Sequence, residues 1–133
     1  MAEFKFVIGQ KDGKSVQKEL KSHEADVLLG LKLGDKVSGD VLGFHGYEFQ
    51  ITGGSDKSGF PMRSDVSGTL RKRIFSTKSM GLRTTRAGEK QRKSFAGNTV
   101  FDGTAQVNVI ILKQGHKPLV EKVEEKKEEV AAL

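Results

Sequence analysis

The segment Ala105-Gln106-Val107-Asn108-Val109-Ile110-Ile111-Leu112 has the pattern of a β-strand that lies inside a sheet. Val107, Val109 and Ile111 recur at every second position, so they fall on one face, because successive side chains of a strand point to opposite faces. The other face carries Ile110 and Leu112 and is partly apolar as well. A strand that is apolar on both faces is expected at the centre of a sheet.

Two more segments alternate in the same way, and a third follows the first of them across a turn. Residues 4–8 and 15–20 flank a turn at Lys11-Asp12-Gly13-Lys14, and Asp-Gly is a frequent pair in hairpin turns. Residues 47–52 alternate apolar and polar side chains without interruption. The sequence therefore predicts an N-terminal hairpin and a further strand in the middle of the chain.

The remaining segments predict shorter elements. Residues 22–29 predict the one helix, which Ser22 would cap and Gly30 would end. Residues 34–46 alternate glycines with short apolar steps and predict a tightly turning strand pair, and residues 70–76 predict a strand with Arg71 and Arg73 exposed. Many short strands and Gly-rich turns favour a mainly β fold, here a small β-barrel with one short helix and a long basic loop.

Composition excludes several classes of function. The chain has 133 residues, which predicts one domain, and no cysteine, which excludes disulfides, thiol catalysis and Cys-ligated metals. No apolar run approaches the ~18 residues of a membrane span, and the N-terminus has no signal-peptide pattern. His23, His45 and His116 are isolated, and no nucleophile is paired with a base. We therefore expect no enzyme, cofactor, metal site, small-molecule substrate or membrane partner.

Positive charge is concentrated in one segment. Residues 63–93 hold ten basic residues and two acids, so this segment carries +8 of a chain whose net charge is +6. Six of the ten are Arg, which binds phosphate through a planar, bidentate fork. One interpretation is a solvated basic face that only aids solubility. The Arg-rich composition instead favours a polyanion as partner.

Residues 77–98 join dense cations to few apolar side chains. Such a segment buries too little surface to order itself, so we expect a loop that is mobile in isolation and becomes ordered on its partner. The last residues, 118–133, are rich in Glu and Lys and predict a charged, flexible tail, which leaves residues 1–117 as the folded domain.

A glycine-rich segment, Ile51-Thr52-Gly53-Gly54-Ser55-Asp56-Lys57-Ser58-Gly59-Phe60-Pro61-Met62, allows two interpretations. Its backbone N–H groups could cradle a phosphate with Lys57 adding charge, or it could form a structural turn before Phe60-Pro61. The spacing does not match the P-loop or the dinucleotide fingerprint. The structural turn is therefore favoured on spacing alone.

Two segments resemble a known family, the small-subunit ribosomal protein six of the archaeal and eukaryotic type in its short archaeal form. The first is residues 51–63, the glycine-rich segment extended to Arg63, and the second is the basic segment Arg86 to Gly97, which is similar to the family's Gly-Glu-(basic)-Lys-Ser-Val-Arg-Gly pattern. Residues 107–115 fit the family's last strand. Phe95-Ala96 stands where the family usually has Val-Arg, so one expected cation is absent.

The resemblance implies a non-enzymatic β-barrel protein that is cytoplasmic and ribosome-bound, with small-subunit rRNA and neighbouring ribosomal proteins as partners. The charge pattern predicts contacts mainly to phosphates and 2′-hydroxyls, and about six phosphate contacts would give log K against log salt a slope of about −4 to −5. The alternative is a non-ribosomal anion-binding or translation-accessory β-barrel module. The predicted rRNA-binding residues are Lys57, Arg63, Arg71, Lys72, Arg73, Lys78, Arg83, Arg86, Lys90, Arg92 and Lys93.

Overall fold

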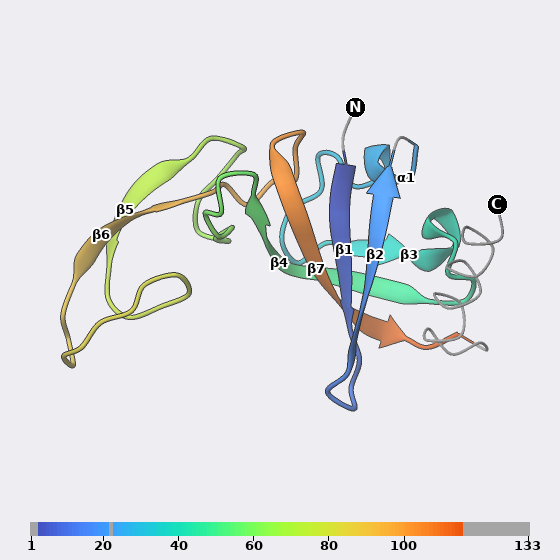
Figure 1. Cartoon of the computed structure of the whole chain (residues 1–133), viewed down its shortest axis with the longest axis horizontal. Helices are drawn as coiled ribbons and strands as arrows, with labels where there is room; N and C mark the ends of the chain where they lie inside the picture. Colours follow the sequence, from blue (N-terminus) through green and yellow to red (C-terminus); the bar gives the residue numbers. More distant parts are fainter. Residues whose placement is uncertain (1–2, 22, 116–133) are drawn as a thin grey trace, which may run out of the picture.

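A computed structural model describes residues 3–21 and 23–115 and contains two β-sheets (Figure 1). The five-stranded sheet has the order β2-β1-β7-β4-β3, and a two-stranded sheet pairs β5 with β6. The predicted cap Ser22, His116 and the predicted tail 118–133 lie outside the described residues. The elements are β1 (Glu3–Gly9), β2 (Ser15–Lys21), α1 (His23–Asp26), β3 (Lys36–Ser38), the 3-10 helix η1 (Gly39–Leu42), β4 (Glu48–Asp56), β5 (Lys72–Ser76), β6 (Gln91–Phe95) and β7 (Thr104–Lys113).

The strand β7 lies at the centre of the larger sheet, as its two partly apolar faces predict. It pairs with β1 in parallel and with β4 in the antiparallel sense. Val107 and Val109 are buried, whereas Ile110 and Leu112 on the opposite face remain partly exposed. The predicted position of this strand is confirmed.

The N-terminal hairpin is also confirmed. β1 pairs antiparallel with β2 from Glu3 opposite Lys21 to Gly9 opposite Ser15. Phe4, Phe6 and Ile8 are all buried, so the period-2 pattern identifies the core-facing side correctly. Phe6 packs edge-on against Phe49 of β4, with the ring centroids 5.6 Å apart.

The predicted barrel is not found, because the sheet stays open. Its two edge strands, β2 and β3, do not pair with each other in the described part of the chain. Instead, the Lys18 ammonium on β2 donates to the Leu42 carbonyl oxygen of η1 at 2.7 Å and lies 4.9 Å from the centre of the Phe44 ring. Glu24 of α1 lies 3.6 Å from the same ammonium. Side-chain contacts of Lys18 therefore connect β2 to η1 and α1, whereas a closed barrel would join β2 to β3 by backbone hydrogen bonds.

Two local predictions are wrong in their extent. The predicted helix 22–29 contains only the four residues of α1, because the next backbone donors bond three residues back, Leu28 to Ala25 and Leu29 to Asp26, and Gly30 then donates to Val100. The predicted strand pair at 34–46 is one three-residue strand, β3, followed by η1.

The predicted structural turn before Phe60-Pro61 is found just after β4, where the Gly59 N–H donates to the Asp56 carbonyl oxygen, but the glycine pair Gly53-Gly54 lies within β4 and not in that turn. A Cβ on Gly54 would clash with the carbonyl oxygen of Gln106 on β7, whereas a Cβ on Gly53 would meet nothing within 4 Å. β4 changes register against β7 between Ile51 and Gly53. Gly54 is thus needed for the close approach of two backbones.

The two neighbouring glycines provide a matched stability test. Gly54→Ala should destabilise the fold by about 2 kcal/mol or more, because the backbone of β7 must move to accept the methyl group. Gly53→Ala should change the free energy of unfolding by less than about 0.5 kcal/mol. Urea denaturation of both variants measures the difference, and equal stabilities would contradict the clash at Gly54.

Candidate nucleic-acid interface

Strands β5 and β6 form an arm that projects away from the larger sheet (Figure 1). We call residues 70–97 the basic hairpin. Between Arg71 and Lys93 it holds nine Lys and Arg and one acid, Glu89. The strands pair antiparallel from Lys72 opposite Phe95 to Ser76 opposite Gln91. The pairing gathers the excess positive charge of the chain on one projecting element.

The basic hairpin has its own small apolar cluster. Val66, Leu82 and Phe95 are buried together, and Ile74 of β5 packs against them. The prediction that residues 77–98 form only a loop is therefore wrong, because residues 91–95 form β6 and the side chains of Leu82, Phe95 and Ala96 are buried. The burial of Phe95 also gives a structural role to the position where the family pattern departs.

Arg63 precedes the basic hairpin in the chain and contacts it through hydrogen bonds and a ring contact. Its guanidinium donates to Ser76 at 3.2 Å and to Ser79 at 3.1 Å, and pairs with Asp65 at 3.1 Å. The same group lies 5.1 Å from the centre of the Phe95 ring. Arg63 therefore links the segment after β4 to the C-terminal end of β5 and to the residues that follow it.

Arg71 fastens the base of the hairpin to the end of β4. Its Nε lies 2.9 Å from Oδ2 of Asp56, a side chain that is only 3% exposed. The guanidinium also donates to Ser58 at 3.1 Å and lies 4.8 Å from the centre of the Phe60 ring. Charge, hydrogen bonding and ring contact together fix where the hairpin leaves the sheet.

The same Asp56 occupies the turn that could have held a phosphate. Its Oδ1 accepts the backbone N–H groups of Ser58 at 3.0 Å and Phe60 at 2.9 Å. An internal carboxylate thus takes two of the amides that a phosphate cradle would need. The geometry disfavours a phosphate site at this turn.

The other nine predicted residues are exposed and are not paired with a carboxylate within the described residues. Their side chains are therefore available to an external anion. They lie on the two strands, in the connection between them, and at the turn after β4. Those on the strands are Lys72, Arg73, Arg92 and Lys93; those in the connection are Lys78, Arg83, Arg86 and Lys90; Lys57 follows β4.

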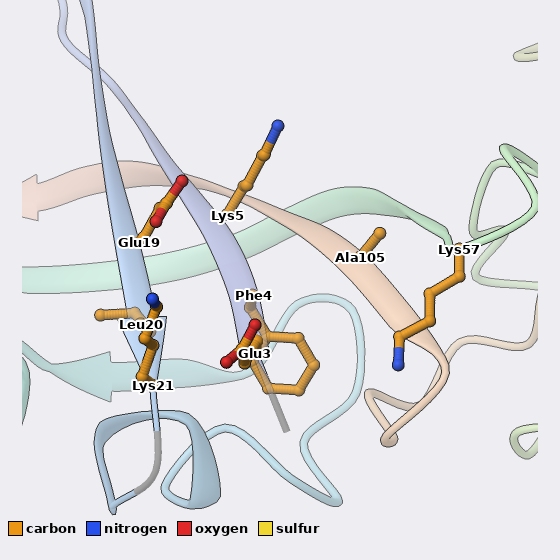
Figure 2. A pocket seen from close by; sticks show the side chains of 8 residues that line it. All are labelled: Glu3, Phe4, Lys5, Glu19, Leu20, Lys21, Lys57 and Ala105. Carbon is orange, nitrogen blue, oxygen red and sulfur yellow. The ribbon is translucent and has the colours of Figure 1, made fainter. Parts of the chain in front are cut away.

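Lys57 also lines a pocket of about 310 Å³ (Figure 2). The pocket lies beside β1 and β2, with Ala105 of β7 on the Lys57 side. The other charged lining residues are two lysines and two glutamates, and Glu3 stands opposite Lys21 in the strand register, as Lys5 does opposite Glu19. This mixed charge gives the pocket little preference for a polyanion.

Other kinds of site are not found among residues 3–21 and 23–115. No group of three or more His, Asp or Glu side chains could hold a metal ion there. The helices in this part of the chain are too short to cross a membrane.

The geometry defines the class of protein: a small, mainly β domain that carries a projecting cationic hairpin. Comparison with known sequences specifies the class further, because a family model described as "Ribosomal protein S6e" matches residues 4–124. The chain belongs to the ribosomal protein S6e family. The resemblance read from the glycine-rich and basic segments is confirmed, as is the expectation of a non-enzymatic protein.

Archaeal relatives cover nearly the whole chain. One named "Small ribosomal subunit protein eS6", from Methanothermobacter thermautotrophicus, is 45% identical over 118 residues, which are 89% of this chain and 93% of the relative. Proteins of the same name from Methanosphaera stadtmanae and Nanoarchaeum equitans are 40% and 43% identical. The alignments cover 95% and 84% of this chain, and 96% and 81% of these relatives.

Sequence reasoning missed how the hairpin is held. Asp56 has a positioning role that its place in a glycine-rich segment did not reveal, since Asp is common in turns for other reasons. Arg63 and Arg71 look like the other cations in the sequence, yet both are engaged within the chain. The exposed Phe75 on β5 was also not singled out.

Proposed function

We propose that this protein is a structural component of the small ribosomal subunit that binds rRNA through the basic hairpin. In that role it is ribosome-bound in the cytoplasm, with rRNA and neighbouring ribosomal proteins as partners. Family membership and the names of its relatives support the ribosomal role. The hairpin itself supports the mode of binding.

One observation carries the proposed binding mode. Eight exposed cations that have no carboxylate partner among residues 3–21 and 23–115 lie on the hairpin, and the fold holds them on an element that projects from the sheet. Keeping like charges together costs free energy unless a polyanion offsets their repulsion. An RNA backbone supplies such a counter-charge, and each contact releases condensed counterions.

The eleven predicted residues divide into two roles in this proposal. Arg63 and Arg71 position the hairpin, since their guanidinium groups already contact Asp65 and Asp56. The other nine form the surface that contacts RNA, with about six of them at phosphates and the others at 2′-hydroxyls, because the major groove of A-form RNA is too narrow for side chains to read. Lys57, beside the mixed pocket, stands at the margin of this surface.

Sedimentation tests the ribosomal assignment. The full chain should co-sediment with purified archaeal small subunits in sucrose gradients at high salt, because many simultaneous contacts hold an integral component in place. Added to RNA extracted from those subunits, it should bind with a log K against log salt slope of about −4 to −5. Release of the protein into the top fractions, together with a flat salt dependence, would overturn the proposal.

A further inference from the structure

Phe75 is the one aromatic side chain of this protein that lies exposed on its surface. All nine aromatic residues fall within the described part of the chain, and the other eight are buried or partly buried. Phe75 is 60% exposed and is the next-to-last residue of β5. Exposing this ring to water on a strand that carries cations is unfavourable unless a partner covers it.

The strand register places cations around this ring. Phe75 stands directly opposite Arg92, and Arg73, two residues back on β5, stands opposite Ser94. Residues paired in this way share a face, with Cβ atoms about 5 Å apart. Ile74, the next residue on β5, packs into the cluster of Val66, Leu82 and Phe95 on the other face. The face that carries Phe75 therefore also carries Arg73, Arg92 and Ser94, whereas Ile74 and Phe95 lie on the opposite face together with the exposed Lys72 and Lys93.

We propose that Phe75 stacks on an unpaired RNA base while Arg73 and Arg92 hold the adjoining phosphates. This inference rests on the proposed function and adds a stacking position to it. A nucleotide carries an anionic phosphate and a flat π-face within a single repeat, which matches the alternation on this face. A duplex keeps its base faces covered, so the partner at this point is a single-stranded loop, bulge or end. An acidic protein surface would satisfy the guanidinium groups but offers the ring no matching face.

Fluorescence provides a direct test, since the chain contains no tryptophan. Phe75→Trp would place a single indole at the proposed position, and stacking on a base should quench its emission. Leu70→Trp is the matched control, because Leu70 precedes β5 in the same basic segment and is 74% exposed. The probes are an oligouridylate of about twelve nucleotides, within the usual range of single-strand binding sites, and inorganic polyphosphate, which has the charge but no bases. Quenching of the Phe75→Trp variant by the oligouridylate alone, with the control unchanged, is the expected result.

Affinity gives a second measurement that does not rely on tryptophan. Phe75→Ala should weaken oligouridylate binding roughly tenfold and leave the salt slope unchanged, because the substitution removes a stacking contact and no charge. Phe75→Leu, which keeps apolar bulk without a π-face, should behave like Phe75→Ala. Polyphosphate affinity should be the same for all three proteins.

Each contrary result points to a different error. Unchanged oligouridylate affinity in Phe75→Ala, complete rescue by Phe75→Leu, or equal quenching by polyphosphate would overturn the stacking position. If Phe75→Ala kept normal RNA affinity but no longer co-sedimented with small subunits, a neighbouring protein would cover the ring. That result would also overturn the stacking position. If the unmodified protein bound neither oligouridylate nor small-subunit rRNA, the proposed function itself would fail.

Discussion

Removing five exposed cations from the basic hairpin should weaken binding to small-subunit rRNA about a thousandfold at physiological salt. Each phosphate contact contributes about 0.7–0.9 to the slope of log K against log salt, so loss of five from about six contacts removes roughly three decades of affinity. The slope itself should fall from about −4 to −5 to near −1. Filter binding or anisotropy across a salt series measures both quantities. The substitutions, all to Gln, are at Arg73, Arg83, Arg86, Arg92 and Lys93.

The control variant removes the same number of positive charges from the larger sheet and the turns beside it. It should keep most of the affinity, because its five exposed lysines lie on or near the larger sheet. Both variants should unfold at nearly the same urea concentration as the unmodified protein, since neither set contacts an acid within the described residues. Equal loss in the two variants would mean that net charge alone governs binding, against a role for the hairpin. The control substitutions to Gln are at Lys5, Lys11, Lys14, Lys36 and Lys113.

Replacing Asp56 with Ala should give the second large effect, a loss of about 2–4 kcal/mol in the free energy of unfolding. The carboxylate is 3% exposed and has three donors, so its removal leaves Arg71 and the amides of Ser58 and Phe60 without their acceptor. The Arg71 side chain is 48% exposed, and water will offset part of that loss. Urea denaturation measures the effect on stability, and rRNA affinity should fall as well because the base of the hairpin is no longer fixed.

Asp65 supplies the comparison for this experiment. It also pairs with a hairpin-positioning arginine, Arg63, at 3.1 Å, but its side chain is 69% exposed. Asp65→Ala should therefore cost less than about 1 kcal/mol. A double-mutant cycle with Asp56→Ala and Arg71→Ala should give a coupling free energy of about 1–3 kcal/mol. Independent effects of those two substitutions would show that the ion pair does not hold the hairpin.

The fold was partly predictable because its strongest signals are local. Phe4, Phe6 and Ile8 recur at every second residue, and a strand with that period has one possible buried face. The central position of β7 followed from apolar side chains on both of its faces. The barrel did not follow, because closure depends on whether β2 meets β3, and no local pattern in either strand specifies that pairing.

The location of the positive charge in the candidate site was predictable from the sequence, but the contacts of its individual side chains were not. Counting Lys and Arg located residues 63–93, and the comparisons confirm the family to which that segment points. The count could not separate Arg71, which pairs with Asp56, from Arg73, which is exposed and has no carboxylate partner within the described residues. It also could not show that Phe95 is buried while Phe75 is bare, since both are phenylalanines among cations.

By itself, the sequence determined the strands of the N-terminal hairpin, the strands at 47–52 and 105–112, the location of the positive charge and the family, because alternation and composition are properties of neighbouring residues. Only the tertiary structure decided which cations hold the hairpin and which of them face solvent. The reason is physical: Asp56 and Arg71 stand fifteen positions apart, and Val66 and Phe95 twenty-nine, so these contacts form only after the chain has folded back on itself. Before the chain folds, all arginines in the basic segment carry the same charge, so the sequence cannot separate those that position the hairpin from those proposed to contact RNA.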